Sequence, residues 1–312
     1  MLFSFFKRNK SNIQVPNWAN FFTQKEYDRF LKLLDSYLVK RNISYTYGNG
    51  VIHIDEEHFG AEKLGLLNLA QICKHSKQVR WRKVIAAHFD ELRQASIFQN
   101  EFDKNIHDFS YVSPYIGVRL YHNNYMSHIE DGLTIGHQLT EDIFALLVFD
   151  FPHSIVNVRP EQTIQWNKYN EELFDIGLSN IRSKYNFNTS EQKIGDITIH
   201  TLEDRHFFVP NVAFDLRNRP DLLGSKGSLI GIPNRHCIII YPIENLEVIT
   251  AINQIIPIIY RLEEQGPGSI SANIFWFQDD EFITLPYKLA EEKLEFYPPE
   301  KFADLLNTLD AA

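Results

Sequence analysis

Two short and almost uninterrupted apolar runs, IFALLVFDF at 143–151 and CIIIYPI at 237–243, constrain the fold of this chain more than any other feature. Neither is long enough to cross a membrane as a helix, which takes about 20 residues. Runs of this length without polar alternation are typical of strands that are covered on both faces. The fold therefore needs layers of other structure on either side of these strands.

Helices with one apolar face are predicted at several places and can supply those layers. TQKE at 23–26 is a capping-box signature, and apolar residues then recur at helical spacing as far as Leu38. A long helix is expected over 246–264, with Pro257 inside it. Three strand pairs are expected among the helices: DITIHTL with HFFVP, SLIGI with CIIIYPI, and SANIFWF with FITLP. We therefore expect an α+β fold in which helices pack on an antiparallel or mixed sheet.

The character of the sequence changes about a third of the way along the chain. The first hundred residues are predicted to form helices around one hairpin at 43–54, whereas strands dominate later. A polar stretch, FQNEFDKNIHDFS, separates the two parts. We therefore expect a helix–hairpin–helix–helix segment over 1–100 and an α+β main domain over 110–312.

Charge and cysteine usage limit the classes of partner. The formal net charge is −9, which disfavours sequence-independent binding to nucleic-acid phosphates. Cys73 and Cys237 lie in apolar runs and lack the spacing of zinc or redox motifs. We expect a cytoplasmic protein without a transmembrane segment, a nucleic-acid partner or a cofactor.

The N-terminal sequence MLFSFFKRNK places apolar residues before Lys7, Arg8 and Lys10. This order is the reverse of a signal peptide. We expect a frayed or core-docked terminus. The alternative is an interfacial anchor, in which the phenylalanines insert into a membrane surface and the basic residues meet the headgroups.

One stretch, HIDEEHF, suggests a metal site. His53, Asp55 and His58 could form a three-ligand corner, but their spacing does not match a helical zinc motif. The structural interpretation is a solvated strand end that leads into capping acids. We therefore expect no metal at this position.

The dipeptide Arg-His occurs twice, as Arg205–His206 and Arg235–His236, each time where a strand is predicted to begin. In one interpretation the two pairs converge with Asp204, forming an anion site with an acid–base histidine. In the other, Asp204 and Asn234 close turns, the arginines pair with acids and the imidazoles cap strand-end carbonyls. Turn closure is the default expectation.

The loop EEQGPGSISANIFWF alternates glycine and proline before two serines, Ser269 and Ser271. It lacks the second glycine of a Gly-x-Ser-x-Gly nucleophile elbow. A tight return from a helix to a strand explains the composition. Since constrained loops often carry binding residues, we keep both serines as ligand-binding candidates.

Several stretches together resemble one family: LGLLNLAQICKH, RWRKVIAAHFDEL, FDFPHSIVNVRPEQTIQW, IPNRHCIIIYPIENLEVITAINQIIPII and EEQGPGSISANIFWF. They are similar to the YtpQ-like family, a group of bacterial proteins of unknown function, over roughly residues 64–285. The resemblance implies a bacterial protein that is not secreted. It implies no catalytic residue, cofactor or partner.

The sequence thus favours a binding or regulatory module, without catalysis, for a protein or a small anionic ligand. Its candidate ligand-binding residues are Arg205, Arg235, Asp204, Asn234, Ser269 and Ser271. The alternative is a hydrolase or phosphate-handling enzyme, with His206 or His236 as base and Arg235 holding an anion. The enzyme requires both imidazoles to converge in one pocket with a carboxylate in reach.

Overall fold

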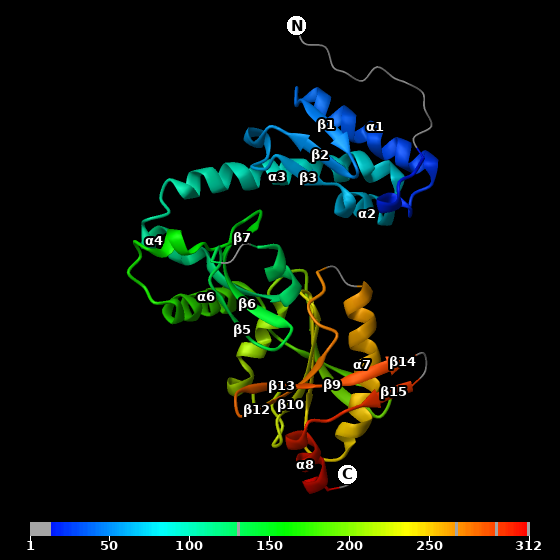
Figure 1. Cartoon of the computed structure of the whole chain (residues 1–312), viewed down its shortest axis with the longest axis vertical. Helices are drawn as coiled ribbons and strands as arrows, with labels where there is room; N and C mark the ends of the chain where they lie inside the picture. Colours follow the sequence, from blue (N-terminus) through cyan, green and yellow to red (C-terminus); the bar gives the residue numbers. More distant parts are fainter. Residues whose placement is uncertain (1–13, 130–131, 266–267, 291–292, 311–312) are drawn as a thin grey trace. The chain divides into compact units, whose positions relative to one another are not determined.

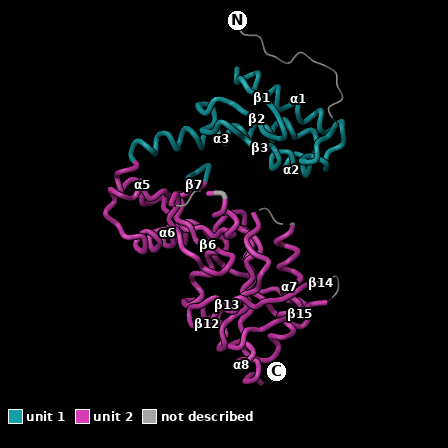
Figure 2. The backbone as a smooth tube through the Cα atoms, viewed as in Figure 1, with its two compact units in different colours: residues 1–105, 151–154 teal, residues 106–150, 155–312 magenta. Residues whose placement is uncertain are grey.

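The computed structural model describes residues 14–129, 132–265, 268–290 and 293–310. The chain divides into two compact units, unit 1 with residues 1–105 and 151–154, and unit 2 with residues 106–150 and 155–312 (Figure 2). Each unit is described by itself. The membrane contact considered for residues 1–10 lies outside the described residues.

Unit 1 combines helices with a small antiparallel sheet (Figure 1). Its helices are α1 (Gln24–Lys40), α2 (Leu67–His75) and α3 (Trp81–Asp103), with the 3₁₀ helices η1 (Asn17–Ala19), η2 (Glu56–His58) and η3 (Gln78–Arg80). Its sheet has the order β1 (Tyr45–Gly48), β2 (Val51–Ile54) and β3 (Lys63–Gly65). The sequence predicts the β1–β2 hairpin but not β3, because a three-residue strand is too short to show alternation.

The capping box predicted at the start of α1 is present. The Thr23 N–H donates to the Glu26 carboxylate at 2.8 Å, and the Glu26 N–H donates to the Thr23 hydroxyl at 3.4 Å. Hydrogen bonds from Lys74 and from the Thr23 N–H hold the pKa of Glu26 at about 2. The cap therefore stays charged, which favours helix formation from this residue onward.

Unit 2 contains two larger antiparallel sheets. The first consists of β4 (Ile116–His122), β6 (Ile143–Asp150) and β5 (Gly136–Gln138), and β7 (Ile155–Asn157) also pairs with β6. The second has the order β13 (Glu281–Leu285), β12 (Ile274–Gln278), β10 (Ser228–Asn234), β11 (Cys237–Pro242), β9 (Ile197–Glu203) and β8 (Ser190–Ile194). A separate hairpin pairs β14 (Tyr287–Ala290) with β15 (Lys293–Phe296).

The helices of unit 2 supply the layers that its apolar strands require. They are α4 (Phe109–Val112), α5 (Pro160–Thr163), α6 (Asn170–Lys184), α7 (Glu247–Gln265) and α8 (Glu300–Thr308), with the 3₁₀ helices η4 (Ser113–Tyr115), η5 (Asn123–His128), η6 (Val209–Phe214) and η7 (Leu216–Asn218). Isoleucines of α7 form one core cluster with β9, β10, β11 and β12. Helix α6 approaches β4 closely at Gly177. A Cβ at this position would lie only 3.0 Å from the Gly117 backbone. This contact fixes β4, which carries part of the candidate site.

One predicted strand pair is wrong. DITIHTL forms β9, but HFFVP at 206–210 is not a strand, and β9 pairs instead with β8 and β11. The Asp204 carboxylate accepts the N–H groups of Arg205 and His206, which turns the chain away from the sheet. Pro210 then lies in the first turn of η6. Local turn geometry thus overrides the apolar pattern of this segment.

The α+β fold class is confirmed, since helices pack on sheets in which the strands of the described residues pair antiparallel. The hairpins β10–β11 and β12–β13 form where the sequence predicts them, and Pro257 lies inside α7. Strand β6 is buried along almost its whole length. Within the described ranges, no helix combines the length and apolar character needed to span a membrane.

Candidate functional site

The two Arg–His pairs lie side by side at neighbouring strand ends in unit 2. Strands β9 and β11 pair with Glu203 opposite Cys237, so the residues next to this pair are adjacent. The Asp204 N–H donates to the His236 carbonyl at 3.1 Å, and the His236 Nδ1 lies 3.0 Å from the Asp204 carbonyl oxygen. The structure therefore brings the segments 204–206 and 234–236 together.

The side chains of Asp204 and Asn234 both bind the backbone. The Asp204 Oδ1 accepts the N–H groups of Arg205 at 2.5 Å and His206 at 3.4 Å, and these bonds lower the pKa of Asp204. The Asn234 Oδ1 accepts the His236 N–H at 2.9 Å, while its Nδ2 donates to a carbonyl of α7 at 3.1 Å. Both residues thus close turns, and their side chains are occupied.

The two imidazoles have different surroundings. The His206 ring lies 4.6 Å from the Tyr185 ring, and its Nε2 is 3.3 Å from a backbone carbonyl oxygen. The His236 ring instead meets the Phe207 ring edge-on at 5.3 Å, and its Nε2 accepts from the Arg235 Nε at 3.1 Å. Burial lowers the pKa of both histidines, and the Arg235 charge lowers that of His236 further. A joint acid–base role for the two stays a prediction.

A pocket of about 500 Å³ lies beside Arg235. Strand β4 contributes Arg119 and Tyr121 to its wall, η5 contributes Tyr125, and Ile270 follows α7 on another side. The Tyr121 and Tyr125 rings stack at 4.3 Å. The pocket therefore combines two guanidinium groups with an apolar, aromatic wall.

Aromatic rings hold both guanidinium groups in place. The Arg235 guanidinium carbon lies 4.4 Å from the centroid of the Phe207 ring, and that of Arg119 lies 5.3 Å from the same ring. Arg119 is also 4.5 Å from the Tyr121 centroid. Such cation–π contacts stabilise a cation without cancelling its charge.

Neither guanidinium forms an ion pair with a carboxylate of a described residue, whereas Arg182 pairs with Asp215 and Arg219 with Asp221. The Arg119 Nε is buried and has no hydrogen-bond partner within the described chain. Burial lowers the pKa of Arg235, and the charge of Arg119 lowers it further. Two uncompensated cations in one pocket are unfavourable unless an anion from outside joins them.

Gly268 allows the backbone to approach Arg235. Its φ is +70°, and a Cβ at this position would lie 2.7 Å from the Arg235 Cδ. The Gly268 carbonyl also accepts the Arg235 N–H at 3.1 Å. Gly268, the second glycine of the Gly-Pro-Gly sequence, therefore helps to support the pocket.

The other predicted ligand-binding residues are dispersed. Ser269 lines the pocket and donates to a carboxylate of α7 at 2.7 Å. Ser271 is buried and donates to the Asp142 carboxylate, so it serves the packing of β12 against the β5–β6 turn. Arg205 is exposed. Arg235 and Ser269 are thus the two predicted residues that line this pocket.

The sequence interpretation missed Arg119, Tyr121, Tyr125 and Phe207. Arg119 does leave a signal, because it is the lone charge within the apolar strand sequence IGVRLY. A charge at such a position requires a partner or a function. Its proximity to Arg235 could not be predicted, since Arg119 lies on β4 and Arg235 in the turn between β10 and β11, strands of another sheet that the sequence does not place beside β4.

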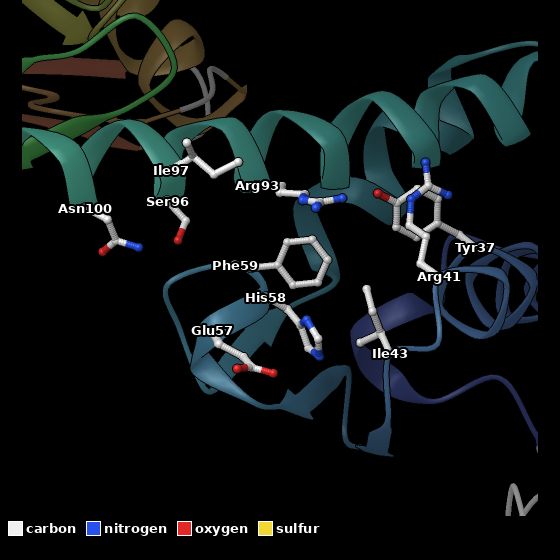
Figure 3. A pocket seen from close by; sticks show the side chains of 10 residues that line it. All are labelled: Tyr37, Arg41, Ile43, Glu57, His58, Phe59, Arg93, Ser96, Ile97 and Asn100. Atoms are coloured by element: carbon white, nitrogen blue, oxygen red, sulfur yellow. The ribbon is translucent and has the colours of Figure 1, made fainter.

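A further pocket, of about 320 Å³, lies in unit 1 next to a candidate metal cluster (Figure 3). Figure 3 shows Glu57 and His58 on one side and residues of α3 on the other. Asp55, Glu57 and His58 offer ligand atoms within 4.8 Å of one another. His53, which the sequence suggested, is not in this group, because the η2 turn gathers residues 55–58 while His53 lies on β2. Exposed carboxylates often cluster without a metal, so this grouping is not by itself a metal site.

Comparison of the chain with protein-family models, curated proteins and solved structures finds no match. The resemblance to the YtpQ-like family stays a prediction. Function has to be inferred from the geometry of the pockets.

Proposed function

We propose that the protein is a binding module without catalytic chemistry, and that its ligand is a small anion held between Arg119 and Arg235. One observation carries the proposal: two guanidinium groups contact one aromatic ring in one pocket, and neither has a carboxylate partner among the described residues. Arginine forks bind phosphate and carboxylate groups through charge-assisted hydrogen bonds. A bound anion would offset the repulsion between the two cations.

The ligand also has an organic part. Tyr121, Tyr125 and Ile270 give the pocket apolar walls that inorganic phosphate alone would leave uncovered. A volume of about 500 Å³ lies within the range of sites for small molecules. A phosphorylated or carboxylated metabolite therefore fits the pocket better than an extended macromolecule.

Binding is a better proposal than hydrolysis for this geometry. The His206 ring contacts Tyr185 and a backbone carbonyl, and the His236 ring accepts from Arg235. His122 does line the pocket, but its Nδ1 accepts the Asn124 N–H at 2.9 Å. Among the described residues, Asp204, the acid closest in sequence to His206, directs its carboxylate to backbone N–H groups. A general base with an orienting carboxylate is what the hydrolase alternative still lacks.

We place this binding role in the bacterial cytoplasm. Cys73 and Cys237 are buried and form no disulfide, which suits a reducing compartment. A module that binds a metabolite there can regulate a partner protein through the ligand-bound state.

Calorimetric titration with inorganic phosphate and with phosphorylated and carboxylated metabolites tests the proposal. We expect phosphate to bind weakly and one class of organic anion to bind more tightly, because it also covers the aromatic wall. Arg119→Gln and Arg235→Gln should each weaken binding by about tenfold or more, the usual loss for a charged hydrogen bond.

Arg205→Gln is the matched control, since it removes the same charge from an exposed position in the adjacent turn. It should leave the affinity unchanged. Equal losses in all three variants would mean that net charge, not the pocket, controls binding. Absence of binding of every anion to the folded wild-type protein would overturn the proposal, and circular dichroism checks that the variants are folded as well.

A further inference from the structure

A second charged surface lies in unit 1, at the end of α2 and the start of α3. No acidic residue occurs between Glu62 and Asp90, whereas the ten residues from 74 to 83 contain five lysines and arginines. Lys74 pairs with Glu26 at 2.9 Å. Lys77, Arg80, Arg82 and Lys83 are exposed and form no ion pair with a described carboxylate. We call residues 77–83 the basic corner.

The basic corner also exposes aliphatic side chains. Val79, which lies between the cations, is 79% exposed, and Ile72 on the neighbouring helix α2 is 51% exposed. A shallow depression of about 440 Å³ is lined by Val79, Arg80, Lys83, Val84 and Ala87. A single exposed aliphatic side chain is common on protein surfaces, but here Val79 lies among four exposed cations and lines the depression with two of them, Arg80 and Lys83.

The position of these cations is unfavourable for the helix itself. Arg82 and Lys83 lie in the first turn of α3, which contains no acidic residue. The helix macrodipole favours acidic residues at the N-terminal end, and cations there destabilise the helix. Arg82 and Lys83, which have no carboxylate partner among the described residues, therefore lie where helix stability would favour the opposite charge.

We propose that the basic corner docks this protein on an anionic membrane surface. Lysine and arginine side chains meet the phosphate and carboxylate groups of acidic lipids, and a protruding aliphatic side chain enters the boundary between headgroups and acyl chains. Val79 and its four neighbouring cations supply both contacts.

The same surface suits nucleic acid less well. Binding to single strands uses exposed aromatic rings on which bases stack, but Trp81, the large aromatic residue of this region, is buried. The aliphatic exposure of Val79 and Ile72 favours a lipid surface.

One patch of this size gives reversible attachment only. Each cation near an anionic surface raises the partition coefficient about fivefold. Stable anchoring requires a second signal. Residues 1–10, for which the sequence offers an interfacial anchor as the alternative, lie outside the described ranges and are not part of this proposal.

Co-sedimentation of the full chain with vesicles tests the proposal. We expect retention on vesicles that mix phosphatidylserine with phosphatidylcholine, none on pure phosphatidylcholine, and release by added salt. Lys77→Glu combined with Lys83→Glu should reduce retention by about tenfold or more, because each change removes one attraction and adds one repulsion. Val79→Ser should also reduce it, at unchanged net charge, because it removes the aliphatic contact.

Lys193→Glu combined with Lys288→Glu is the matched control, since both lysines are exposed in unit 2 and the charge change is the same. Deletion of residues 1–10 separates the N-terminal contribution. Equal loss in the control pair, full retention of the Lys77/Lys83 variant, or capture of RNA instead of vesicles would each overturn the proposal. Since the arginine pocket belongs to unit 2, its proposed ligand is tested independently.

Discussion

The pockets of the two units each hold an arginine against an aromatic ring, but they differ in counter-charge. In unit 1, the Arg41 guanidinium carbon lies 3.8 Å from the Tyr37 centroid, and its terminal nitrogen is 3.0 Å from the Asp90 carboxylate. In unit 2, Arg119 and Arg235 lie over Phe207 without a carboxylate partner among the described residues. The aromatic contact is common to both pockets, and the carboxylate is present in one.

The anion site proposed in unit 2 depends on this difference. A ring positions the guanidinium group without neutralising it, whereas a carboxylate satisfies both its charge and its donors. Arg41 is therefore already satisfied within the protein. Arg119 and Arg235 retain the capacity to bind an anion from outside.

The largest effect is expected from Gly268→Ala, which disturbs the unit 2 pocket without changing a charge. The new Cβ would lie 2.7 Å from the Arg235 Cδ, and the φ of +70° disfavours an L residue by about 1–2 kcal/mol. We expect a lower melting temperature and an anion affinity reduced by about tenfold, since Arg235 must move. Thermal unfolding and phosphate titration measure the two effects.

Gly132→Ala is the control for backbone strain. Gly132 has a φ of +81°, but a Cβ there would meet nothing within 4 Å. It should lower the melting temperature similarly and leave the anion affinity intact. If both variants lose affinity equally, the approach of Gly268 to Arg235 is not what supports the site.

The sequence predicted most of the elements that depend on local patterns. The capping box at Thr23 and the apolar run of β6 follow from residues close together in the chain. The segment 206–210 has the composition of a strand, yet the side chain of Asp204 turns it out of the sheet. A hydrogen bond to the backbone can thus outweigh hydrophobic pattern at a strand end.

The candidate site was only partly predictable. Arg235 stood out because its dipeptide recurs, but its neighbours Arg119 and Phe207 come from β4 and from a loop before η6. No spacing in the sequence specifies that three such segments meet. The basic corner, by contrast, is visible in the sequence, where five of the ten residues from 74 to 83 are lysines or arginines; it was missed because the net charge of −9 describes the whole chain and hides a local excess of cations.

Asp90→Asn tests the role of the carboxylate in unit 1. In the structure the Tyr37 hydroxyl donates to the Asp90 Oδ1 at 2.6 Å. Asparagine keeps an oxygen that can accept this hydrogen bond but removes the charge that neutralises Arg41. Because the pair is exposed, we expect a loss of about 0.5–1 kcal/mol in the free energy of unfolding. Chemical denaturation measures it. Phosphate should stabilise this variant more than it does one that also carries Arg41→Gln, and equal stabilisation would contradict the role given to Asp90.

A smaller effect of opposite sign is expected in unit 2. Without ligand, Arg119→Gln removes one of two uncompensated cations, so the free energy of unfolding should rise by about 0.5 kcal/mol at low salt. Arg182→Gln, which breaks the ion pair with Asp215, should instead lower it. A decrease in the free energy of unfolding of both variants would show that Arg119 stabilises the fold, and would contradict its proposed role as an anion ligand.

The smallest effect concerns pH and His236. Burial and the Arg235 charge lower the pKa of His236 below its ordinary 6.5, so the unfolded chain takes up this proton first as pH falls. The stability that neutral His236 provides is therefore present above about pH 6.5 and is lost progressively below it. His236→Gln should flatten that part of the decline in melting temperature. If phosphate binds beside Arg235 as proposed, it neutralises that charge and should reduce the decline attributable to His236. It should not reduce the decline attributable to His206, whose pKa is lowered by burial without a contribution from Arg235. Melting curves of the wild type, His236→Gln and His206→Gln, each with and without phosphate, measure both contributions, and an equal response of the two histidines to phosphate would mean that no anion binds beside Arg235.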